Sequence, residues 1–367
     1  MAADDRCRPR VLLLTSGPVD GGLGGDTDLA MALARGVPNV RYRWFRKWPR
    51  PDAMVRDIPG TPVPLASRDG VPHLPERVQA AAAGTVLGRR CDLVHAVLTI
   101  GSGFPRFSRV WPRLLGGTPV LHTVPGVMDP ALLAQCHPLG PTVALSEATA
   151  KALRTAGFQD VRVISPVVPL DAWPWRPRPS AEPPTVLVTG HHDEGGGAEE
   201  ALASAAVASR AGARFRLVLA LRDRPGQDTR ARERALWARA ARAGLPETEV
   251  LGHVDDMHGL MASADVLLYV PRTLGGKADI PLTVLQALAT GRPVILSGLP
   301  QFESLHDTVV RSAPGDCLGT GRLLVQLWER PRWWRQLAER GRAVVEEHFG
   351  EARFLAQYTS LYEELLP

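Results

Sequence analysis

The chain has 367 residues, a length that favours two domains of roughly 170 residues each over one larger core. Hydrophobic residues make up 45% of the sequence and charged residues 22%, which are ordinary globular values and exclude a disordered or fibrous chain. The net charge is +5, but only three of the 43 basic residues are lysine. Such an arginine bias is typical of a GC-rich genome, so the basic balance is weak support for a nucleic-acid partner, and we expect none.

Neither a membrane span nor a secretion signal is expected. No apolar run approaches the roughly 18 to 20 residues that cross a bilayer, and "MAADDRCRPR" lacks a charged segment followed by an apolar one. The cysteines, Cys7, Cys91, Cys136 and Cys317, form no CxxC pair and have no histidines at metal spacing. We therefore expect a cytoplasmic protein without disulfides and without a bound metal or cofactor.

Strand-like and helix-like segments alternate along the first half of the chain, which predicts an α/β architecture with a parallel sheet. The segment "RYRWFRKWPRP" at 41–51 is expected to be a strand and loop, either solvated or facing an anionic or membrane-surface partner. The segment 146–157 predicts a helix with Ser146 as its N-cap and Gly157 as its stop. Apolar runs predict strands at 10–17, 91–97, 118–124, 141–146 and 161–168.

A proline-rich linker separates this half from a second alternating pattern. Residues 165–184 carry seven prolines and no periodicity, and proline removes a backbone donor. The predicted domains are 1–168, completed by a final helix at 350–367, and 185–349, with 169–184 as the linker. Ligands of doubly wound sheets bind beyond the carboxyl ends of the strands, so we expect the site in a cleft between the two domains. Strands of the second domain are predicted at 185–190, 214–221, 248–254, 265–271 and 292–298.

The segment "GGKADIPLTVLQALATGRPVIL" at 275–296 follows one of these strands, and its sequence predicts a glycine-rich loop, a short apolar helix and a buried strand. The helix is expected to begin near Leu282 or Thr283, where free N–H groups and the positive helix end would suit a phosphate. Thr283 would add a hydroxyl and Lys277 an ammonium group. The alternative is an ordinary turn in which Thr283 caps the helix and Lys277 is solvated.

The segment "ADVLLYVP…PLTVLQALATGRPVILSGLPQFESL" resembles the donor-binding region of retaining glycosyltransferases with the GT-B fold, family 4. Other parts match in order: "GGLGGDTDLAMALA" resembles the family's N-terminal glycine loop, "PVLHTVPG" its histidine strand and "LGHVDDMHGLMASADVLLYV" the segment beneath the nucleotide base. The resemblance covers nearly the whole chain. It implies two Rossmann-like doubly wound domains facing across a cleft, with a C-terminal helix that crosses back to the first domain.

The resemblance also implies roles for individual residues. His122 matches the family's active-site histidine near the reacting sugar, although a core histidine is the alternative. Gly24 and Gly25 match the loop that lets backbone approach the donor or acceptor, where a Cβ would clash. The remaining matching residues are implied to contact the nucleotide base, the diphosphate or the ribose. They are Gly252, His253, Val254, Leu282, Thr283 and Gln286.

Four charged residues of the family pattern are absent. Gln286 stands at the second position of the family's glutamate pair, and Ala278 at the first. The turn "GHHDEGGG", which begins at Gly190, has His191 and Gly196 where the family has its phosphate-binding Arg and Lys. Glutamine still hydrogen-bonds a ribose, but a departing nucleoside diphosphate develops negative charge that the missing cations would have stabilised.

Several residues are candidates for compensation, although each is equally readable as a solvated charge. Lys277 adjoins Ala278, Arg222 and Arg224 follow a strand, and a protonated His191 would sit beside a diphosphate. Asp279 would contact sugar hydroxyls in place of the missing glutamate.

Two functions follow from these residues. The first is a retaining glycosyltransferase that moves a sugar from a nucleotide-sugar co-substrate to a hydroxyl of a small molecule, glycan or lipid, with His122, Lys277 and Asp279 as catalytic candidates. The second is a catalytically silent protein of the same fold that binds a nucleotide-sugar or serves as a partner subunit. A periplasmic-type receptor is disfavoured because no signal sequence is recognisable. The oligomeric state stays open.

Overall fold

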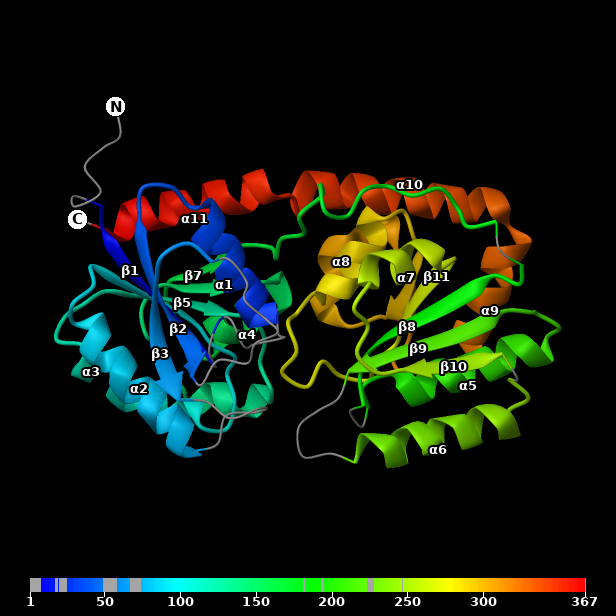
Figure 1. The fold of residues 1–367 in the computed structure, drawn as a ribbon, viewed down its shortest axis with the longest axis horizontal. Helices are drawn as coiled ribbons and strands as arrows, with labels where there is room; N and C mark the ends of the chain where they lie inside the picture. The colour runs from blue at the N-terminus through cyan, green and yellow to red at the C-terminus, as the bar shows by residue number, and fades with distance from the viewer. Residues whose placement is uncertain are drawn as a thin grey trace. The chain divides into compact units, whose positions relative to one another are not determined.

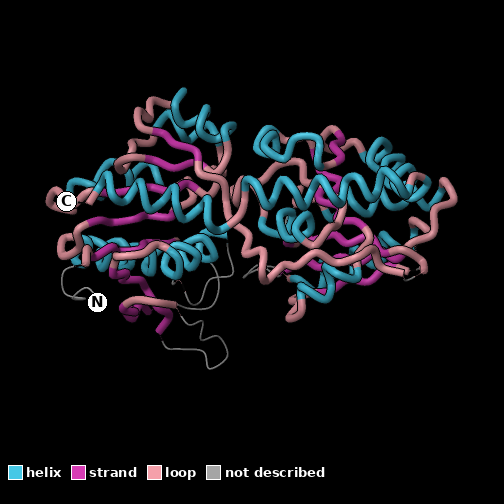
Figure 2. Tube along the Cα trace, turned by 90° about the horizontal axis from the view of Figure 1, so that it is seen from above, coloured by secondary structure: helices cyan, strands magenta, loops and turns pink. Residues whose placement is uncertain are grey.

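The computed structural model of the chain describes residues 8–16, 19, 25–48, 58–66, 74–180, 182–192, 195–222, 228–245 and 247–366. The chain forms two compact units (Figure 1). Unit 1 consists of Met1–Val167, Gly275–Asp279 and Glu351–Pro367, and unit 2 of Val168–Leu274 and Ile280–Gly350. In each unit strands lie between layers of helices (Figure 2).

Unit 1 is built on a parallel sheet, which in the described residues has seven strands in the order β3-β2-β1-β4-β5-β6-β7. Alternate residues of the strand at 10–15 enter two different cores: Val11 and Leu13 pack under the helices at 25–36 and 351–365, and Leu12 and Leu14 under the helices at 74–88, 104–114 and 147–155. Both faces of the strand are therefore buried, as its continuous apolar sequence predicts. The strands are β1 (Arg10–Thr15), β2 (Arg41–Trp48), β3 (Thr61–Ala66), β4 (Leu93–Val97), β5 (Val120–Val124), β6 (Thr142–Ala144) and β7 (Val161–Val163).

The helices of unit 1 are α1 (Gly25–Gly36), α2 (Leu74–Gly88), α3 (Phe104–Leu114), α4 (Glu147–Thr155) and α11 (Glu351–Leu365), with the 3-10 segment η2 (Pro130–Gln135). The predicted ends of α4 are confirmed: Ser146 accepts a 3.2 Å hydrogen bond from the Thr149 N–H, and Gly157 follows in the left-handed region. The predicted return of the C-terminal helix to the first domain is also confirmed, because α11 packs into the core of unit 1.

A buried polar chain fastens α11 to the sheet. The Tyr362 hydroxyl lies 2.7 Å from His95 Nδ1, and His95 Nε2 lies 2.8 Å from Thr123 Oγ1. Thr123 in turn lies 3.0 Å from the hydroxyl of Tyr358. Burial lowers the pKa of His95 to about 3, so its ring is neutral and each nitrogen has a partner at neutral pH.

Strand β3 is one element that the apolar runs do not predict. Its sequence, Thr61–Ala66, contains Pro62 and Pro64, which cannot donate to a neighbour. Among the strands that the structure describes, it lies at the edge of the sheet and pairs only with β2. A proline-containing strand is tolerated there because one side of an edge strand has no partner to satisfy.

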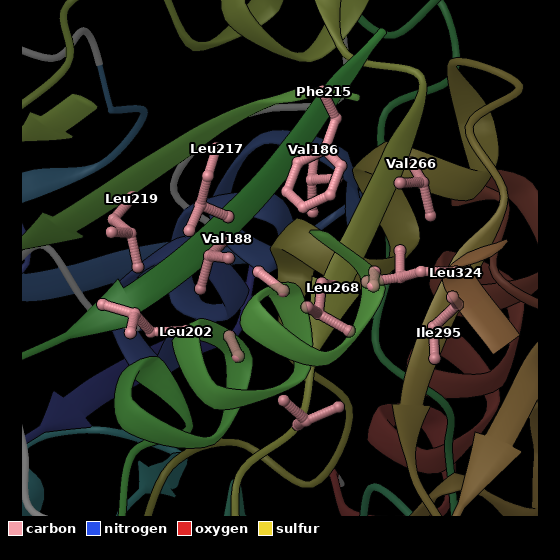
Figure 3. Close-up of a cluster of buried hydrophobic side chains, with 14 of the residues drawn as sticks. Val186, Val188, Leu202, Phe215, Leu217, Leu219, Val266, Leu268, Ile295 and Leu324 are labelled. Atoms are coloured by element: carbon pink, nitrogen blue, oxygen red, sulfur yellow. The ribbon is translucent and has the colours of Figure 1, made fainter. Parts of the chain in front are cut away.

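Unit 2 is a second parallel sheet, with six described strands in the order β10-β9-β8-β11-β12-β13. Val186 and Val188 of β8 face one core, shown in Figure 3, and Leu187 faces the other. The strands are β8 (Thr185–His191), β9 (Arg216–Arg222), β10 (Thr248–Leu251), β11 (Val266–Tyr269), β12 (Val294–Ser297) and β13 (Val310–Ser312). The helices are α5 (Ala198–Arg210), α6 (Thr229–Arg242), α7 (Met257–Ser263), α8 (Leu282–Ala289), α9 (Cys317–Glu329) and α10 (Pro331–His348), with the 3-10 segment η3 (Pro300–Thr308).

The described part of the proline-rich segment 169–184 has no regular helix or strand and packs on unit 2. Trp173 is only 6% exposed and stacks on His258 with ring centroids 3.9 Å apart. The Arg176 N–H donates to the Thr290 carbonyl at 3.1 Å. The segment is thus anchored by the buried Trp173 ring and by this single backbone hydrogen bond, without strand pairing. Among the described residues, no helix is long and apolar enough to cross a membrane.

Candidate functional site

The carboxyl edge of the sheet in unit 2 carries several of the predicted donor-binding residues. Strands β8 and β9 end side by side, with His191 paired to Arg222 in the parallel register. Strand β10 ends at Leu251, next to β9, so His253 and Val254 follow at the same edge. His253 is exposed and its Nε2 lies 3.3 Å from an oxygen of Asp255. Loops at this edge of a doubly wound sheet are where ligands bind.

A glycine turn after β8 lies against the end of β11. Gly195 and Gly197 both have positive φ angles, 69° and 100°, which favour glycine. A Cβ at Gly197 would lie 2.8 Å from the Pro271 nitrogen, so the close approach also requires glycine. Gly190 and Gly196 face each other across the turn, where a Cβ on Gly190 would lie 3.9 Å from the Gly196 carbonyl oxygen. The turn thus brings backbone close to the strand ends.

Helix α8 begins without a side-chain cap. Its N-cap is Pro281, which makes no capping hydrogen bond. The next two residues, Leu282 and Thr283, are half-exposed, and the first N–H groups of a helix have no partner within it. The start predicted near Leu282 or Thr283 is therefore confirmed, and Thr283 lies one residue inside the helix and is not its cap. Gln286 is half-buried one turn further on.

His122 on β5 is completely buried in unit 1. Its ring stacks on Phe104, with centroids 5.0 Å apart. Nε2 lies 3.0 Å from the Leu98 carbonyl, which only accepts, so Nε2 carries the proton. Burial lowers the pKa of His122 to about 4, and the ring is neutral at pH 7. Nδ1 is therefore a bare acceptor, and it has no hydrogen-bond partner among the described residues.

The loop Gly275–Asp279 packs on unit 1. The Asp279 N–H donates to the Pro125 carbonyl at 2.9 Å, and a Cβ on Gly126 would collide with the Lys277 carbonyl oxygen. A Cβ on Gly25 would lie 3.2 Å from that of Ala278, tighter than most such contacts. Gly25 thus lies close to the position where the family pattern has its first glutamate, and its predicted approach to a donor or acceptor stays a prediction. Gly24 lies outside the described residues.

The carboxylate of Asp279 is 2% exposed and bonded within unit 1, where Ser146 Oγ donates to its Oδ2 at 2.7 Å. Burial raises the pKa of Asp279 to about 6, although the hydrogen bonds from Ser146 and Thr149 lower it. The burial of Asp279 and its hydrogen bond from Ser146 hold the loop in place. The direct contact of Asp279 with sugar hydroxyls stays a prediction. Lys277 is half-buried on the same loop.

Metal-binding side chains do not gather in the described part of the chain: no group of three His, Cys, Asp or Glu residues is positioned to hold an ion. Cys91, Cys136 and Cys317 are free thiols, and burial raises the pKa of Cys91 and of Cys136. Cys7 and Arg224 lie outside the described residues.

The sequence of unit 2 matches a known family. Residues 183–325 match the model of the family described as glycosyl transferases group 1. Residues 183–325, the group 1 segment, are therefore similar to the group 1 glycosyltransferases. The family predicted from the motifs is thereby confirmed over the segment that holds β8 to β13, the glycine turn and α8.

Further comparisons extend the likeness of this group 1 segment to the whole fold. HepE from Anabaena in complex with UDP-glucose has a TM-score of 0.75 at 14% identity, covering 97% of this chain and 100% of that one. Sucrose-phosphate synthase from Thermosynechococcus elongatus has a TM-score of 0.77 at 18% identity, covering 98% and 99%. The chain thus has the GT-B fold, as predicted.

One curated relative matches a shorter stretch. The N-acetyl-alpha-D-glucosaminyl L-malate synthase of Bacillus anthracis is 30% identical over 119 residues, which are 32% of this chain and 30% of that protein. The match therefore spans less than a third of the relative's length.

The structure adds Arg272 to the candidate residues of the group 1 segment. It follows Pro271 directly after β11, and its N–H donates to the Gly195 carbonyl at 3.1 Å. Its Nε lies 2.5 Å from Glu200, whose hydrogen bond raises the pKa of Arg272. The side chain is 63% exposed, whereas that of Glu200 is 9% exposed. The signal available in the sequence was a cation directly after the strand predicted at 265–271.

The predicted site residues thus divide between the two units. The residues that follow β10, the glycine turn 195–197 and the start of α8 lie at the carboxyl edge of the sheet in unit 2, together with Arg272. His122, Gly25, Lys277 and Asp279 belong to unit 1.

Proposed function

We propose that the protein is a retaining glycosyltransferase that transfers a sugar from a nucleotide-sugar, with a uridine diphosphate sugar as the first donor to test, to a hydroxyl acceptor. The observation that carries the proposal is the carboxyl edge of the group 1 segment, where the glycine turn 195–197 and the uncapped start of α8 present backbone N–H groups. Such groups bind phosphate well. The complexes of HepE with UDP-glucose support the choice of nucleotide.

Donor binding would use backbone N–H groups and a small number of charged side chains. The N–H groups of Leu282 and Thr283 would hold the diphosphate, with Lys277 and Arg272 supplying the positive charge that His191 and Gly196 lack. Gln286 would hydrogen-bond the ribose hydroxyls, because an amide both donates and accepts. Main-chain contacts after β10, at His253 and Val254, would hold the base.

Transfer would take place on the face of the sugar from which the nucleotide leaves. The leaving phosphate oxygen would take the proton of the acceptor hydroxyl, which then bonds to the anomeric carbon on that same face. Catalysis would come from positioning and from stabilisation of the leaving diphosphate. His122 would orient the donor sugar, since its unprotonated Nδ1 can accept a hydrogen bond from a sugar hydroxyl. No divalent metal is proposed to take part.

A second function is favoured by one specific observation. Ala278, Gln286, His191 and Gly196 replace the four charged residues of the family pattern. A protein that only binds a nucleotide-sugar, or that serves as a partner subunit, has no leaving group to stabilise and tolerates such losses.

One experiment separates these possibilities. Thermal shifts with UDP, GDP, ADP and dTDP would identify the nucleotide, and hydrolysis of the matching sugars with and without EDTA would then measure turnover. Under the enzyme proposal Lys277→Ala abolishes turnover, whereas Lys151→Ala, an exposed lysine on α4, leaves it unchanged. Stabilisation without hydrolysis or transfer to any offered acceptor would favour the silent protein. If none of the four nucleotides stabilised the fold, the proposed assignment of the donor site would be wrong.

A further inference from the structure

Two helices of unit 1 expose aliphatic side chains to solvent. On α2, Leu74 is 74% exposed, Val78 60% and Val86 55%. On α3, Val110 is 52% exposed and Leu114 45%, one helical turn apart. Scattered single apolar residues are normal on a surface, but five on two neighbouring helices form a feature that needs an explanation.

The two helices pack side by side (Figure 1). Trp111 of α3 is 3% exposed, and its indole N–H donates to the Ala81 carbonyl of α2 at 3.3 Å. At the C-terminal ends of the two helices, the Nε–H of Arg89 donates to the Leu114 carbonyl at 2.6 Å. Because Trp111 and Gly84 face inward between the helices, the exposed aliphatic side chains belong to the outer faces.

Arginines surround these aliphatic residues. Arg106, Arg109 and Arg113 of α3 are exposed and recur at helical spacing on the same side as Val110 and Leu114. Arg89 and Arg90 follow the end of α2 and are exposed as well. Residues 74–114 hold six arginines and two carboxylates, and one of these carboxylates, Asp92, pairs with Arg10 at 3.5 Å. Helix α3 itself has no acidic residue.

We propose that the outer faces of α2 and α3 form a docking surface for an anionic lipid bilayer. An amphipathic helix with apolar residues and arginines on its exposed side lies in the membrane interface, where the arginines meet lipid phosphates and the aliphatic groups enter the acyl boundary. A protein partner is the weaker choice because the exposed apolar groups are separate aliphatic side chains, without the clustered aromatic anchors that dominate protein interfaces. The surface is independent of the proposed transfer reaction.

The test is co-sedimentation of the purified full chain with vesicles. Vesicles of phosphatidylcholine with about one third phosphatidylglycerol are expected to bind the protein, whereas pure phosphatidylcholine vesicles bind it weakly. Raising the salt from about 0.05 to 0.5 M should weaken binding, because it shortens the screening length. The variant Arg106→Ala/Arg109→Ala/Arg113→Ala should bind the anionic vesicles on the order of 100-fold more weakly, because each positive charge near an anionic surface raises the affinity about fivefold.

A matched control lies on α6 of unit 2. Arg230, Arg234 and Arg242 are also exposed on one helix, so Arg230→Ala/Arg234→Ala/Arg242→Ala removes the same charge. It should keep nearly all of the binding, and an equal loss in both variants would overturn the proposal. A second variant, Val110→Ser/Leu114→Ser, keeps every charge and should bind about tenfold less, by the lost aliphatic contact. Absence of binding to anionic vesicles at low salt would also overturn the proposal and would leave an acidic protein as the occupant to test.

Discussion

Ser146 Oγ donates a 2.7 Å hydrogen bond to Asp279 Oδ2 and accepts a 3.2 Å hydrogen bond from the Thr149 N–H. One hydroxyl therefore caps α4 and holds a loop that lies 133 residues further along the chain. The carboxylate that it binds is buried near the start of that helix, where the positive end of the dipole favours an anion.

This relationship predicts a pH dependence. Burial raises the pKa of Asp279 from 3.8 to about 6, so the folded state holds a proton that the unfolded state releases. Proton binding by Asp279 therefore stabilises the fold fully below about pH 4. This stabilisation, on the order of 3 kcal/mol of unfolding free energy, is lost as the pH rises through about 6. Asp279→Asn removes the titration, so its melting temperature relative to wild type should rise by about 5 °C between pH 4 and pH 7.5. The exposed Asp171→Asn is the control, and a difference for Asp279→Asn that does not change with pH would contradict the assignment.

A second prediction concerns the contact of Gly126 with the same loop. A Cβ at Gly126 collides with the Lys277 carbonyl oxygen, and this backbone atom cannot move aside by a rotamer change as a side-chain atom can. Gly126→Ala should cost about 1 to 3 kcal/mol of stability and displace the loop. Gly103→Ala, where a Cβ meets nothing within 4 Å, should leave the melting temperature unchanged. Equal melting temperatures for the two variants would show that the loop is not held as described.

Arg272→Gln tests the cation that the sequence motifs did not reveal. If its guanidinium helps to neutralise the diphosphate, UDP should bind about 10-fold to 100-fold more weakly, because a charge-assisted hydrogen bond is lost. Glu200→Gln removes the carboxylate that occupies Arg272, so UDP should bind at least as tightly as to wild type. Arg335→Gln, an exposed arginine on α10, is the control in a calorimetric titration. Unchanged UDP affinity in Arg272→Gln would exclude the role.

His122 is expected to act as a neutral residue. With a pKa of about 4, it does not titrate between pH 6 and 9, so a pH–rate profile over that range should carry no inflection from His122. His122→Phe keeps a ring against Phe104 but lacks Nδ1, and it should lower turnover by about 100-fold or more while the fold melts normally. A variant with wild-type turnover would make His122 a core residue.

The polar chain under α11 predicts coupled losses of stability. Tyr362→Phe leaves His95 Nδ1 buried without its 2.7 Å partner, which should cost about 1 to 3 kcal/mol. Thr123→Val breaks the next link in the chain, so a double-mutant cycle should give a coupling energy of about 0.5 kcal/mol or more. Additive losses in thermal or urea unfolding would show that the links act separately.

Much of the fold was predictable because its signals are local. Apolar runs such as "RVLLLTSG" indicate strands buried on both faces, and Ser146 and Gly157 mark the ends of α4 through their own side-chain and backbone preferences. Strand β3 was missed because Pro62 and Pro64 disfavour a strand, and only its place at the sheet edge permits one. The order of the motifs from 183 to 325 identified the family of that segment, which no single motif did.

The sequence by itself determined two parallel sheets, the glycosyltransferase motifs and the four absent charges, since each depends on residue types and short spacings. Only the tertiary structure decided that Gly275–Asp279 packs against Gly126 and Ser146, that Arg272 lies beside the glycine turn, and that Val110 and Leu114 share an exposed face with three arginines. The physical reason is that such relationships depend on which distant segments are packed together. Burial, and with it the pKa of Asp279 and of His122, follows from that packing.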